Sequence, residues 1–329
     1  MICIKNNCLD PRFNLALEEY VIKEMDPRED YLLLWQNSPS VIIGRNQNTV
    51  EEINMEFVER HGIHVVRRLS GGGAVYHDLG NLNFTFVTTG EDEIRNNFRR
   101  FTEPVIKALA RLGVKAEHTG RNDITIDGKK FSGNAQYYYR DRVLHHGTIL
   151  FNSDLDMVQK VLKVRADKIA SKGIKSVRSR VTNVIDYLPR KITLAEFKEL
   201  LEKMLLEDSG EKSRYYELSE RDLSRVRQLM EQRYNTWEWN YGRSPAFTFQ
   251  KGERFAGGYL EVRLDVQKGF IARCKIHGDF FGRREVEELE ALFTGARYEP
   301  AALRDLLTRV EVEEYMAGIT QENLLSCLF

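Results

Sequence analysis

The sequence predicts an α+β protein built from two domains, and three features of the chain support this prediction. Short apolar runs bounded by turn residues are typical of strands, and they are interspersed with longer segments of helical periodicity. The chain has 329 residues, which is enough for two domains with separate cores. An aromatic and then turn-like stretch, Trp237–Pro245, separates two helical segments from a later hairpin pattern. We therefore expect a first domain over residues 1–245 and a small α+β domain over residues 246–329.

Composition and charge exclude several classes of protein. Lys+Arg and Asp+Glu number 49 each, so a surface for nucleic acid or another polyanion is not expected. No apolar run approaches the roughly 20 residues that span a bilayer, and the N-terminus lacks the layout of a secretory signal. The four cysteines, Cys3, Cys8, Cys274 and Cys327, have neither metal-ligand spacing nor the density of a disulfide framework. These observations predict a cytoplasmic protein without a membrane partner.

Local signals place the elements of the first domain. Asp10 is a capping residue before Pro11 at the first helical position, and apolar residues follow at helical spacing through Glu24. Asp127-Gly128 between two short runs is typical of a hairpin turn. The same reasoning predicts strands at Tyr31–Trp35, Ser40–Ile43, Ile124–Ile126, Lys129–Gln136 and Ile149–Phe151, and helices at Thr49–Arg60, Glu93–Leu112, Asp154–Val164, Thr193–Leu206 and Ser219–Tyr234.

The second domain shows a simpler pattern. Tyr259–Val266 and Phe270–Ile276 alternate between apolar and polar residues and predict an antiparallel hairpin. Glu285–Phe293 and Ala301–Val310 have the periodicity of amphipathic helices. No chemistry can be assigned to this domain from its residues.

The chain is organised around the stretch Val65–Phe86, in which Arg67 and Arg68 run into three consecutive glycines, Gly71–Gly73. We interpret it as a strand, a tight loop and a returning strand. Glycines let a ligand approach the backbone closely, and successive N–H groups in such a turn can bind an anion. Arginines at the mouth of the loop would add charge-assisted donors for carboxylate or phosphate. An ordinary hairpin connection remains the alternative interpretation.

This loop differs from the common nucleotide motifs. A P-loop ends in Gly-Lys-Ser/Thr, whereas Ala74-Val75-Tyr76 follow the glycines here, and Tyr76 also occupies the last glycine position of a dinucleotide fingerprint. If the loop binds an anion, it is therefore a less common type of anion-binding loop.

A second candidate region is the hairpin around Lys130. Gly120-Arg121-Asn122-Asp123 leads into the first strand, and Lys130 and Gly133 lie on the second. A lysine on such a strand is commonly a solvated edge residue. Lys129 already offers that charge, and Gly133 permits close approach of a ligand or another backbone, so Lys130 is also a candidate for a functional role.

Two further segments contain candidate residues. His145 and His146 are adjacent on a predicted strand and should point to opposite faces, which makes them a poor pair of metal ligands. Residues 172–183 contain four cations and no acid, which fits a lid over an anionic ligand or a solvated loop.

Five blocks of the sequence, in order, resemble the lipoate–protein ligase family. They are Arg67–Asn83, Gly120–Asp123, Lys130–Ala135, His145–Thr148 and Lys172–Asn183. The resemblance covers nearly the whole chain, including the C-terminal domain. It implies a mixed-sheet catalytic domain of the biotin and lipoate ligase type, with helices packed against the sheet.

The resemblance also implies a two-step reaction. Lipoate attacks the α-phosphate of ATP to give lipoyl-AMP and pyrophosphate. A lysine of an apo lipoyl domain or of the glycine cleavage H protein then attacks this adenylate, which gives an amide and releases AMP. Lys130 is implied to be the catalytic cation, and Mg²⁺ would neutralise the pyrophosphate with Asp123 as a candidate ligand. Asp123 could instead orient a base or a sugar hydroxyl.

The resemblance carries over to a larger set of positions that would bind ATP or lipoyl-adenylate. They are Arg68, Ser70, Gly71, Gly72, Gly73, Ala74, Val75, Tyr76, His77, Asn81, Asn122, Asp123, His146, Gly147, Thr148, Lys172 and Arg178. His77 and His146 are expected to be pocket-wall residues rather than proton carriers.

Two other functions remain open at this stage. An octanoyl- or lipoyltransferase of the same superfamily would need a cysteine nucleophile, yet the chain has none between Cys8 and Cys274. A non-catalytic protein that binds lipoate or a nucleotide would have no use for Lys130. A biotin ligase is disfavoured because the glycine block differs from that family's loop. Lipoate and octanoate cannot be distinguished, since one methylene is worth only about 1–3 kcal/mol in an apolar pocket.

Overall fold

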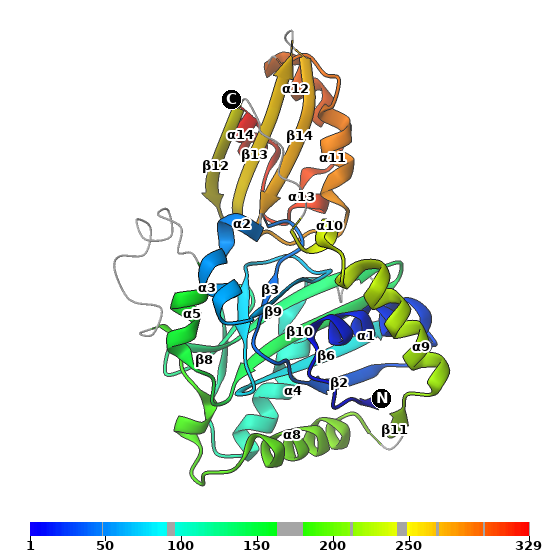
Figure 1. Ribbon diagram of the computed structural model, residues 1–329, viewed down its shortest axis with the longest axis vertical. Helices are drawn as coiled ribbons and strands as arrows, with labels where there is room; N and C mark the ends of the chain where they lie inside the picture. Colours follow the sequence, from blue (N-terminus) through cyan, green and yellow to red (C-terminus); the bar gives the residue numbers. More distant parts are fainter. Residues whose placement is uncertain are drawn as a thin grey trace. The chain divides into compact units, whose positions relative to one another are not determined.

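The computed structural model of the protein (Figure 1) forms two compact units, which are described separately. The structure describes residues 1–47, 49–90, 96–162, 180–210, 213–241, 249–267, 270–298 and 300–328. The first unit comprises Met1–Ile42, Ile53–Arg67 and Val75–Asn240, and the second comprises Ile43–Glu52, Arg68–Ala74 and Tyr241–Phe329. The glycine loop thus clusters with the C-terminal segment. The expected boundary between residues 245 and 246 lies outside the described residues.

A mixed eight-stranded sheet forms the centre of the first unit, as the family resemblance implied. Its order is β11-β1-β2-β6-β10-β9-β8-β7. The strands are β1 (Ile2–Lys5), β2 (Tyr31–Trp35), β6 (Asn81–Thr89), β7 (Glu117–Thr119), β8 (Asp123–Ile126), β9 (Lys129–Tyr139), β10 (Arg142–Leu150) and β11 (Arg214–Glu217). β1 is parallel to both of its neighbours, and the pairs from β2 to β7 are antiparallel.

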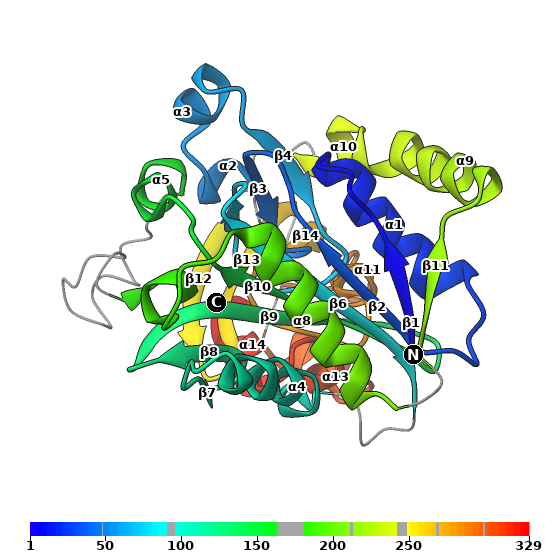
Figure 2. The ribbon, with the colours of Figure 1, turned by 90° about the horizontal axis from the view of Figure 1, so that it is seen from below.

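Helices cover both faces of this sheet, because its strands direct buried apolar side chains to both sides (Figure 2). Leu32 and Leu34 of β2 belong to the core under α4 (Phe98–Arg111) and α8 (Leu194–Asp208). Leu33, between them in the chain, points the other way. It belongs to the core under α1 (Pro11–Glu24) and α9 (Glu220–Leu229).

Caps and turns confirm several predicted boundaries. The Asp10 carboxylate accepts a hydrogen bond from the Arg12 backbone N–H at the start of α1. Thr193 forms a complete capping box with Glu196 at the start of α8. The hairpin turn between β8 and β9 places Asp127 and Gly128 at φ values of 50° and 72°, as the Asp-Gly signal predicted. The remaining short elements of this unit are α3 (Met55–Arg60), α5 (Leu155–Val161), η2 (Val184–Tyr187), the π-helical turn η3 (Met230–Tyr234) and α10 (Trp237–Asn240).

Two predicted helices were wrong in extent. The helix expected from Glu93 begins only at Phe98, because Asn97 caps it and Asn96 has a φ of 59°, which a helix does not allow. Residues 91–95 are outside the described residues. The helix expected over Thr49–Arg60 is two helices, α2 (Thr49–Glu52) and α3. Asn54 caps α3 after a bridge between Ile53 and Leu162, which interrupts the helical pattern.

A small second sheet excludes the simple hairpin interpretation of the glycine stretch. Its order is β4 (His64–Arg67), β3 (Ser40–Ile43) and β5 (Val75–His77), so β3 lies between the two strands that flank the glycines. The apolar run expected to return directly from the loop is β6, which belongs to the large sheet. The loop is therefore a connection over a neighbouring strand rather than a tight hairpin turn.

The C-terminal part of the second unit is a three-stranded antiparallel sheet with helices, and its central hairpin confirms the prediction. The elements are β12 (Phe249–Phe255), β13 (Gly258–Gln267), β14 (Phe270–Gly278), α11 (Val286–Phe293), α12 (Pro300–Leu307), α13 (Val312–Tyr315) and α14 (Gln321–Leu328). The sequence patterns missed β12, α13 and α14. Phe280, Leu289 and Leu303 are fully buried in its core.

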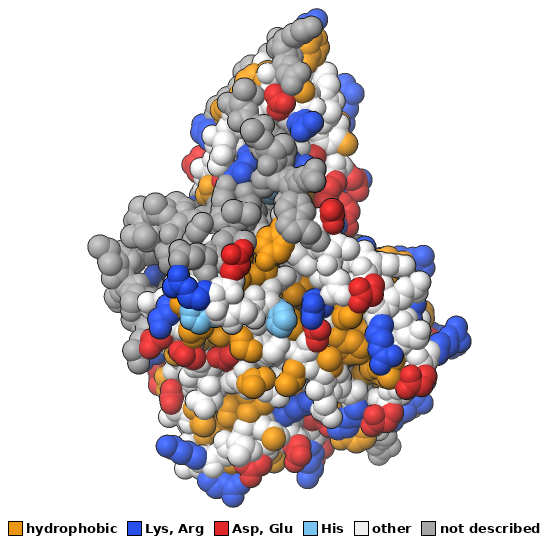
Figure 3. All heavy atoms as spheres, in the orientation of Figure 1, with side chains coloured by type: hydrophobic (Ala, Val, Ile, Leu, Met, Phe, Trp, Pro, Cys, Tyr) orange, Lys and Arg blue, Asp and Glu red, His pale blue; other side chains and the backbone are white. Residues whose placement is uncertain are grey.

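The surface agrees with the balanced composition. On the face shown in Figure 3, Lys and Arg side chains are interspersed with Asp and Glu. Within the described residues, no helix has the length and apolar character needed to cross a membrane.

Candidate functional site

The guanidinium group of Arg68 holds the glycine loop from within. It is buried, and its Nη2 atom donates to the carbonyl oxygens of Gly71 at 2.6 Å and Gly73 at 2.8 Å. Its Nε atom donates to Ser70 Oγ at 3.0 Å. The arginine that we expected to meet phosphate is therefore bonded to carbonyl groups of its own loop.

The glycine loop also has backbone N–H groups that can donate to a ligand, whereas its Gly71 and Gly73 carbonyls already accept hydrogen bonds from Arg68. Within the described part of the chain, no acceptor is found for the backbone N–H groups of Gly73 and Ala74. A Cβ built on Gly73 would meet no described atom within 4 Å, so a ligand has space to approach this backbone. Gly72 has a φ of +93°, which favours glycine and turns the chain at this point. Bare N–H groups beside a guanidinium are suited to an anion.

Arg67 has a different function from its neighbour. Its Nε atom donates to the carbonyl oxygen of Trp239 at 2.9 Å, and its backbone N–H donates to Asn240 Oδ1 at 3.0 Å. Trp239 Nε1 in turn donates to the Arg67 carbonyl at 2.7 Å. These bonds attach β4 to α10, so Arg67 is a structural residue.

Lys130 lies near the start of β9 and forms an ion pair with Asp123 of β8, with Nζ 2.7 Å from Oδ1. The Lys130 side chain is 40% exposed and the Asp123 side chain is 38% exposed. A Cβ on Gly133 would lie 2.9 Å from Lys130 Nζ, so the lysine side chain lies over the bare backbone of that glycine. The close approach predicted at Gly133 is thus made by Lys130 itself.

Asn122 fixes the loop in front of this ion pair. Its Nδ2 atom donates to the Asn134 carbonyl at 2.6 Å, and its own carbonyl accepts from the Asn134 backbone at 2.9 Å. Asp123 contributes one carboxylate to the region. Among the described residues, no three His, Cys, Asp or Glu side chains gather as a metal site.

A row of polar side chains lines one face of the large sheet. On β6, Asn83 and Thr85 alternate with apolar residues, and the register pairs them with Thr148 and His146 of β10. Thr148 Oγ1 accepts a hydrogen bond from the Gly133 backbone at 3.2 Å, which brings this face to the glycine under Lys130. These pairs connect the predicted blocks around residues 81, 133 and 146.

Sequence reasoning missed the residues that hold His146. Its Nδ1 atom donates to Glu18 Oε1 at 3.0 Å, and Glu18 also accepts from Thr85 Oγ1 at 2.5 Å. Trp35 Nε1 donates to Thr85 Oγ1 at 2.9 Å. All these side chains except His146 are buried. The polar alternation in β6 was a usable signal for Thr85, whereas nothing in the helical pattern of α1 marks Glu18.

His145 points to the opposite face, as predicted. It is fully buried and stacks on Phe101 with ring centroids 4.7 Å apart. Burial lowers the pKa of His145 well below its usual value, and the nearby His146 adds to this effect. Gly147 is required for packing, since a Cβ there would lie 2.2 Å from Asn134 Oδ1 and 2.4 Å from the Phe84 ring.

The remaining predicted residues lie at the ends of β5 and β6. His77 is buried, with Nδ1 3.0 Å from the Asn37 amide nitrogen. Asn81 is fully buried and donates to Asn83 Oδ1 at 3.0 Å, while its Oδ1 has no hydrogen-bond partner among the described residues. Burial raises the pKa of Tyr76 to about 12, so its phenol stays protonated, and Val75 is half-buried.

Most of the predicted lid, including Lys172 and Arg178, lies outside the described residues. Its last residues are described. Thr182 N–H donates to the Lys130 carbonyl at 3.0 Å, and Val181 forms a parallel bridge with Lys130. The end of the predicted lid is therefore attached to the backbone of the candidate catalytic lysine.

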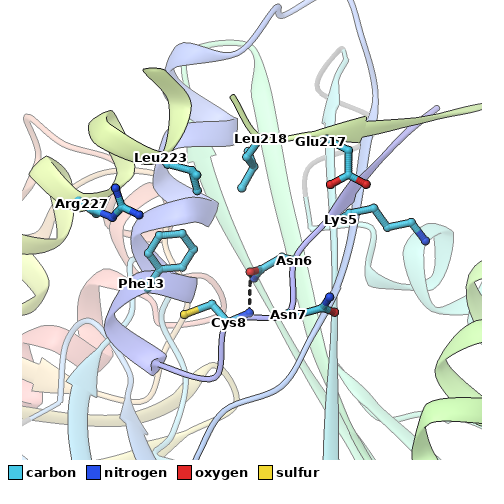
Figure 4. A pocket seen from close by; sticks show the side chains of 9 residues that line it. All are labelled: Lys5, Asn6, Asn7, Cys8, Phe13, Glu217, Leu218, Leu223 and Arg227. Carbon is cyan, nitrogen blue, oxygen red and sulfur yellow. Dashed lines mark hydrogen bonds between the residues drawn. The ribbon is translucent and has the colours of Figure 1, made fainter. Parts of the chain in front are cut away.

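A separate cavity of about 560 Å³ opens at the ends of β1 and β11 (Figure 4). None of the predicted site residues lines it. Cys8 does, next to Phe13 and Leu223. Burial raises the pKa of the Cys8 thiol, and it also raises those of Cys3 and Cys327, to about 12 and 11. These thiols are poorly ionised at neutral pH, which is unfavourable for a nucleophile.

Comparison with known proteins assigns the chain to a family. The model of the lipoyl protein ligase A/B catalytic domain matches residues 10–206, and that of the bacterial lipoate protein ligase C-terminus matches residues 244–328. Over 332 aligned residues the chain is 50% identical to the lipoate-protein ligase LplJ of Bacillus subtilis, with 100% of each chain covered.

Solved structures agree with this assignment. A crystal structure of P. falciparum LipL1 in complex with lipoate has a TM-score of 0.81 at 26% identity, covering 99% of this chain and 97% of that one. A bi-partite lipoate protein ligase from Thermoplasma acidophilum, described with its E2 lipoyl domain, has a TM-score of 0.67 at 33% identity and covers 75% and 98%. A lipoate-protein ligase A bound with ATP has a TM-score of 0.64 at 31% identity and covers 73% and 98%.

The fold and these matches define a ligase with a mixed α+β catalytic domain and a small C-terminal domain. The chain belongs to the lipoate–protein ligase family. The expectation of an enzyme of this class is confirmed.

Proposed function

We propose that this enzyme activates lipoate with ATP to form lipoyl-AMP and then transfers the lipoyl group to a lysine of an apo lipoyl domain. Nucleotide binding is inferred from the glycine loop. The N–H groups of Gly73 and Ala74 have no acceptor among the described residues, and the loop carbonyls accept hydrogen bonds from Arg68. Support for the substrates comes from relatives, which include one structure with lipoate and another with ATP.

In this proposal the loop binds phosphate oxygens through its backbone. Arg68 donates to three acceptors of the loop, so its positive charge is held at the loop and adds to the positive field of the N–H donors. Preorganised donors of this kind are each worth about 10²–10³ in rate when aimed at developing charge. Arg68 then acts by fixing the donors as well as by its charge.

Lys130 supplies the movable cation. Its ammonium is a compact charge on a flexible stem, and its partner Asp123 is partly exposed, so exchange of that partner for a phosphoryl or acyl oxygen costs little. The carboxylate of lipoate and the α-phosphate repel one another, and a cation between them lowers the barrier to attack. Positioning the acceptor lysine against the adenylate supplies much of the acceleration in the second step.

The described residues fit a Mg²⁺ ion only if ATP brings most of its ligands. Mg²⁺ is commonly bound by one or two carboxylates together with substrate phosphates, and Asp123 offers one carboxylate. When bound, the ion would neutralise charge on the leaving pyrophosphate.

The polar face of the large sheet would line the substrate pocket. His146 is held by Glu18, and Asn81 Oδ1 is a buried acceptor without a partner among the described residues. These groups orient a substrate rather than transfer protons. The proposed acceptors present the target lysine on a folded lipoyl domain. They are the lipoyl domains of 2-oxoacid dehydrogenase acyltransferase subunits and the glycine cleavage H protein.

The direct test is incubation with ATP, Mg²⁺, lipoate and an apo lipoyl domain, followed by intact-mass measurement of the domain. We expect a mass increase of one lipoyl group that requires ATP and is lost in the Lys130→Ala enzyme. Modification without ATP from a lipoyl or octanoyl thioester would contradict the proposal.

Substitution of the cysteines tests the alternative function, a transferase that works through an acyl-enzyme. Cys8→Ser removes the thiol that lines the cavity beside β1, and alanine at the three buried positions Cys3, Cys274 and Cys327 avoids burying a hydroxyl. We expect each variant to keep the ligase activity of the parent enzyme. Loss of turnover in a folded cysteine variant would favour an acyl-enzyme.

A further inference from the structure

The C-terminal segment holds the glycine loop through the backbone of Phe280. The Gly72 N–H donates to the Phe280 carbonyl at 3.3 Å. A Cβ on Gly71 would lie 2.3 Å from the same carbonyl oxygen, so only glycine allows this approach. The Phe280 side chain is fully buried in the C-terminal core, which fixes the position of its carbonyl.

Phe281 contacts the next residue of the loop. A Cβ on Gly72 would lie 3.2 Å from the Cε1 and Cζ atoms of the Phe281 ring, so this ring packs against the bare Gly72 backbone. Phe281 is itself held, because its carbonyl accepts from the Ala317 N–H at 2.7 Å. Two consecutive residues of the C-terminal segment therefore contact two consecutive glycines.

A second connection runs through the loop after β3. The Arg45 N–H donates to the Ser70 carbonyl at 3.0 Å, and the Arg45 guanidinium forms an ion pair with Glu285, the residue before α11. The Asn46 carbonyl accepts from the Gly278 N–H at 2.5 Å. Arg45 thus joins the start of the glycine loop to the C-terminal segment.

We propose that Phe281 and the Arg45–Glu285 pair are positioning residues for nucleotide binding. They fix the shape of the glycine loop, and through it the direction of the Gly73 and Ala74 N–H donors. The C-terminal domain thereby sets the affinity for ATP. This inference rests on the proposed function, because it assumes that the loop binds the nucleotide.

The test is lipoate-dependent exchange of pyrophosphate into ATP, with KM measured separately for ATP and for lipoate. In Glu285→Arg and Arg45→Glu we expect the KM for ATP to rise about fivefold, as suits a partly exposed ion pair, with little change in the KM for lipoate. The doubly reversed enzyme, with both substitutions, restores the pair and should recover most of the loss. Phe281→Ala should raise the KM for ATP on the order of tenfold, and Phe281→Leu less.

The matched control is Glu314→Gln, which removes an ion pair with Arg283 at 3.2 Å in the same segment. Arg283 and Glu314 make no described contact with the glycine loop, so the KM for ATP should stay at the parent value. Thermal melting shows whether each variant is folded.

The possible outcomes separate this inference from the proposed function. An unmodified enzyme without exchange activity overturns the proposed function. Active, folded variants that match Glu314→Gln, or that raise both KM values equally, overturn the positioning role alone. A selective change in ATP affinity with recovery in the doubly reversed enzyme supports it.

Discussion

The ammonium nitrogen of Lys130 lies 2.9 Å from the point where a Cβ atom on Gly133 would stand. The Lys130 Cε atom is at 3.0 Å from the same point, so the side chain is laid along the bare backbone of its own strand. From there it reaches Asp123 at 2.7 Å. The missing side chain at Gly133 thus determines where the lysine charge rests.

Gly133→Ala should displace that charge while preserving the fold. The new Cβ meets the end of a flexible side chain, which can move away at little cost. We expect the melting temperature to change by only about 1–3 °C and adenylate formation to fall on the order of tenfold, since a displaced cation no longer meets the developing charge. Pyrophosphate exchange and thermal melting check this prediction, and an unchanged exchange rate would contradict it.

Lys130→Ala should reduce adenylate formation strongly, with a loss on the order of 10²–10³ in exchange rate. Its neighbour Lys129 is exposed on the same hairpin and provides the matched control, because Lys129→Ala removes an identical charge from the adjacent position. The control should retain the parent rate. Equal losses of exchange rate in the two variants would mean that Lys130 acts only through the general surface charge and not at the reacting groups.

Gly73→Ala should weaken ATP binding, whereas Gly44→Ala should lower the stability of the fold. A Cβ on Gly73 meets no described atom within 4 Å, so the fold should persist while binding of ATP weakens where the ligand approaches the backbone. A Cβ on Gly44 would lie 1.8 Å from the Gly72 carbonyl oxygen, which forces the backbone to move. We expect a loss of about 1–3 kcal/mol in the free energy of unfolding for Gly44→Ala. Denaturant unfolding and calorimetric ATP titration distinguish the two effects.

Glu18→Gln tests whether the polar face of the sheet lines the lipoate part of the proposed substrate pocket. Glu18 accepts hydrogen bonds from Thr85 and from His146, and an amide of the same shape offers one oxygen in place of a carboxylate. We expect the KM for lipoate to rise severalfold with the KM for ATP unchanged, together with a stability loss of about 1–3 kcal/mol. A rise in both KM values would contradict a role of Glu18 that is confined to lipoate.

Stability should fall in acid through Asp222. Burial acts to raise the pKa of this carboxyl, but hydrogen bonds from Tyr20, Ser219 and Tyr216 outweigh it and lower the pKa to about 2. The folded-state pKa lies below the unfolded value, so the stabilisation is complete above about pH 4 and is lost as the pH falls toward 2. It amounts to about 2 kcal/mol. Unfolding measured from pH 6 to pH 2 should be less pH-dependent in Asp222→Asn, and an identical slope would contradict the assignment.

Local signals in the chain predicted those parts of the fold that local physics controls. Asp10 before Pro11 and the turn at Asp127-Gly128 favour a cap and a hairpin by themselves, because the interactions involved span only a few residues. The histidine pair followed the same rule, since adjacent residues of a strand must point to opposite faces. His145 went to the core and His146 to the polar face.

Errors occurred where a distant segment competed with local preference. The helix expected across Ile53 is interrupted by a bridge to Leu162, more than a hundred positions later in the chain. The strands before and after the glycines, β4 and β5, do not pair with each other, because β3 lies between them in the sheet. β3 precedes both strands in the sequence. Periodicity contains no information about such pairings.

By itself the sequence determined the family and the kinds of group in the site: bare glycine backbone, an arginine, a lysine and a polar strand face. Tertiary structure alone decided their partners. Arg68 donates hydrogen bonds to carbonyls of its own loop, and the Lys130 side chain lies over Gly133. The Gly72 N–H of the loop donates to the Phe280 carbonyl of the C-terminal segment. The reason is physical: a residue type fixes which bonds a group can make, but the partner is whichever complementary group the folded chain brings within about 3 Å.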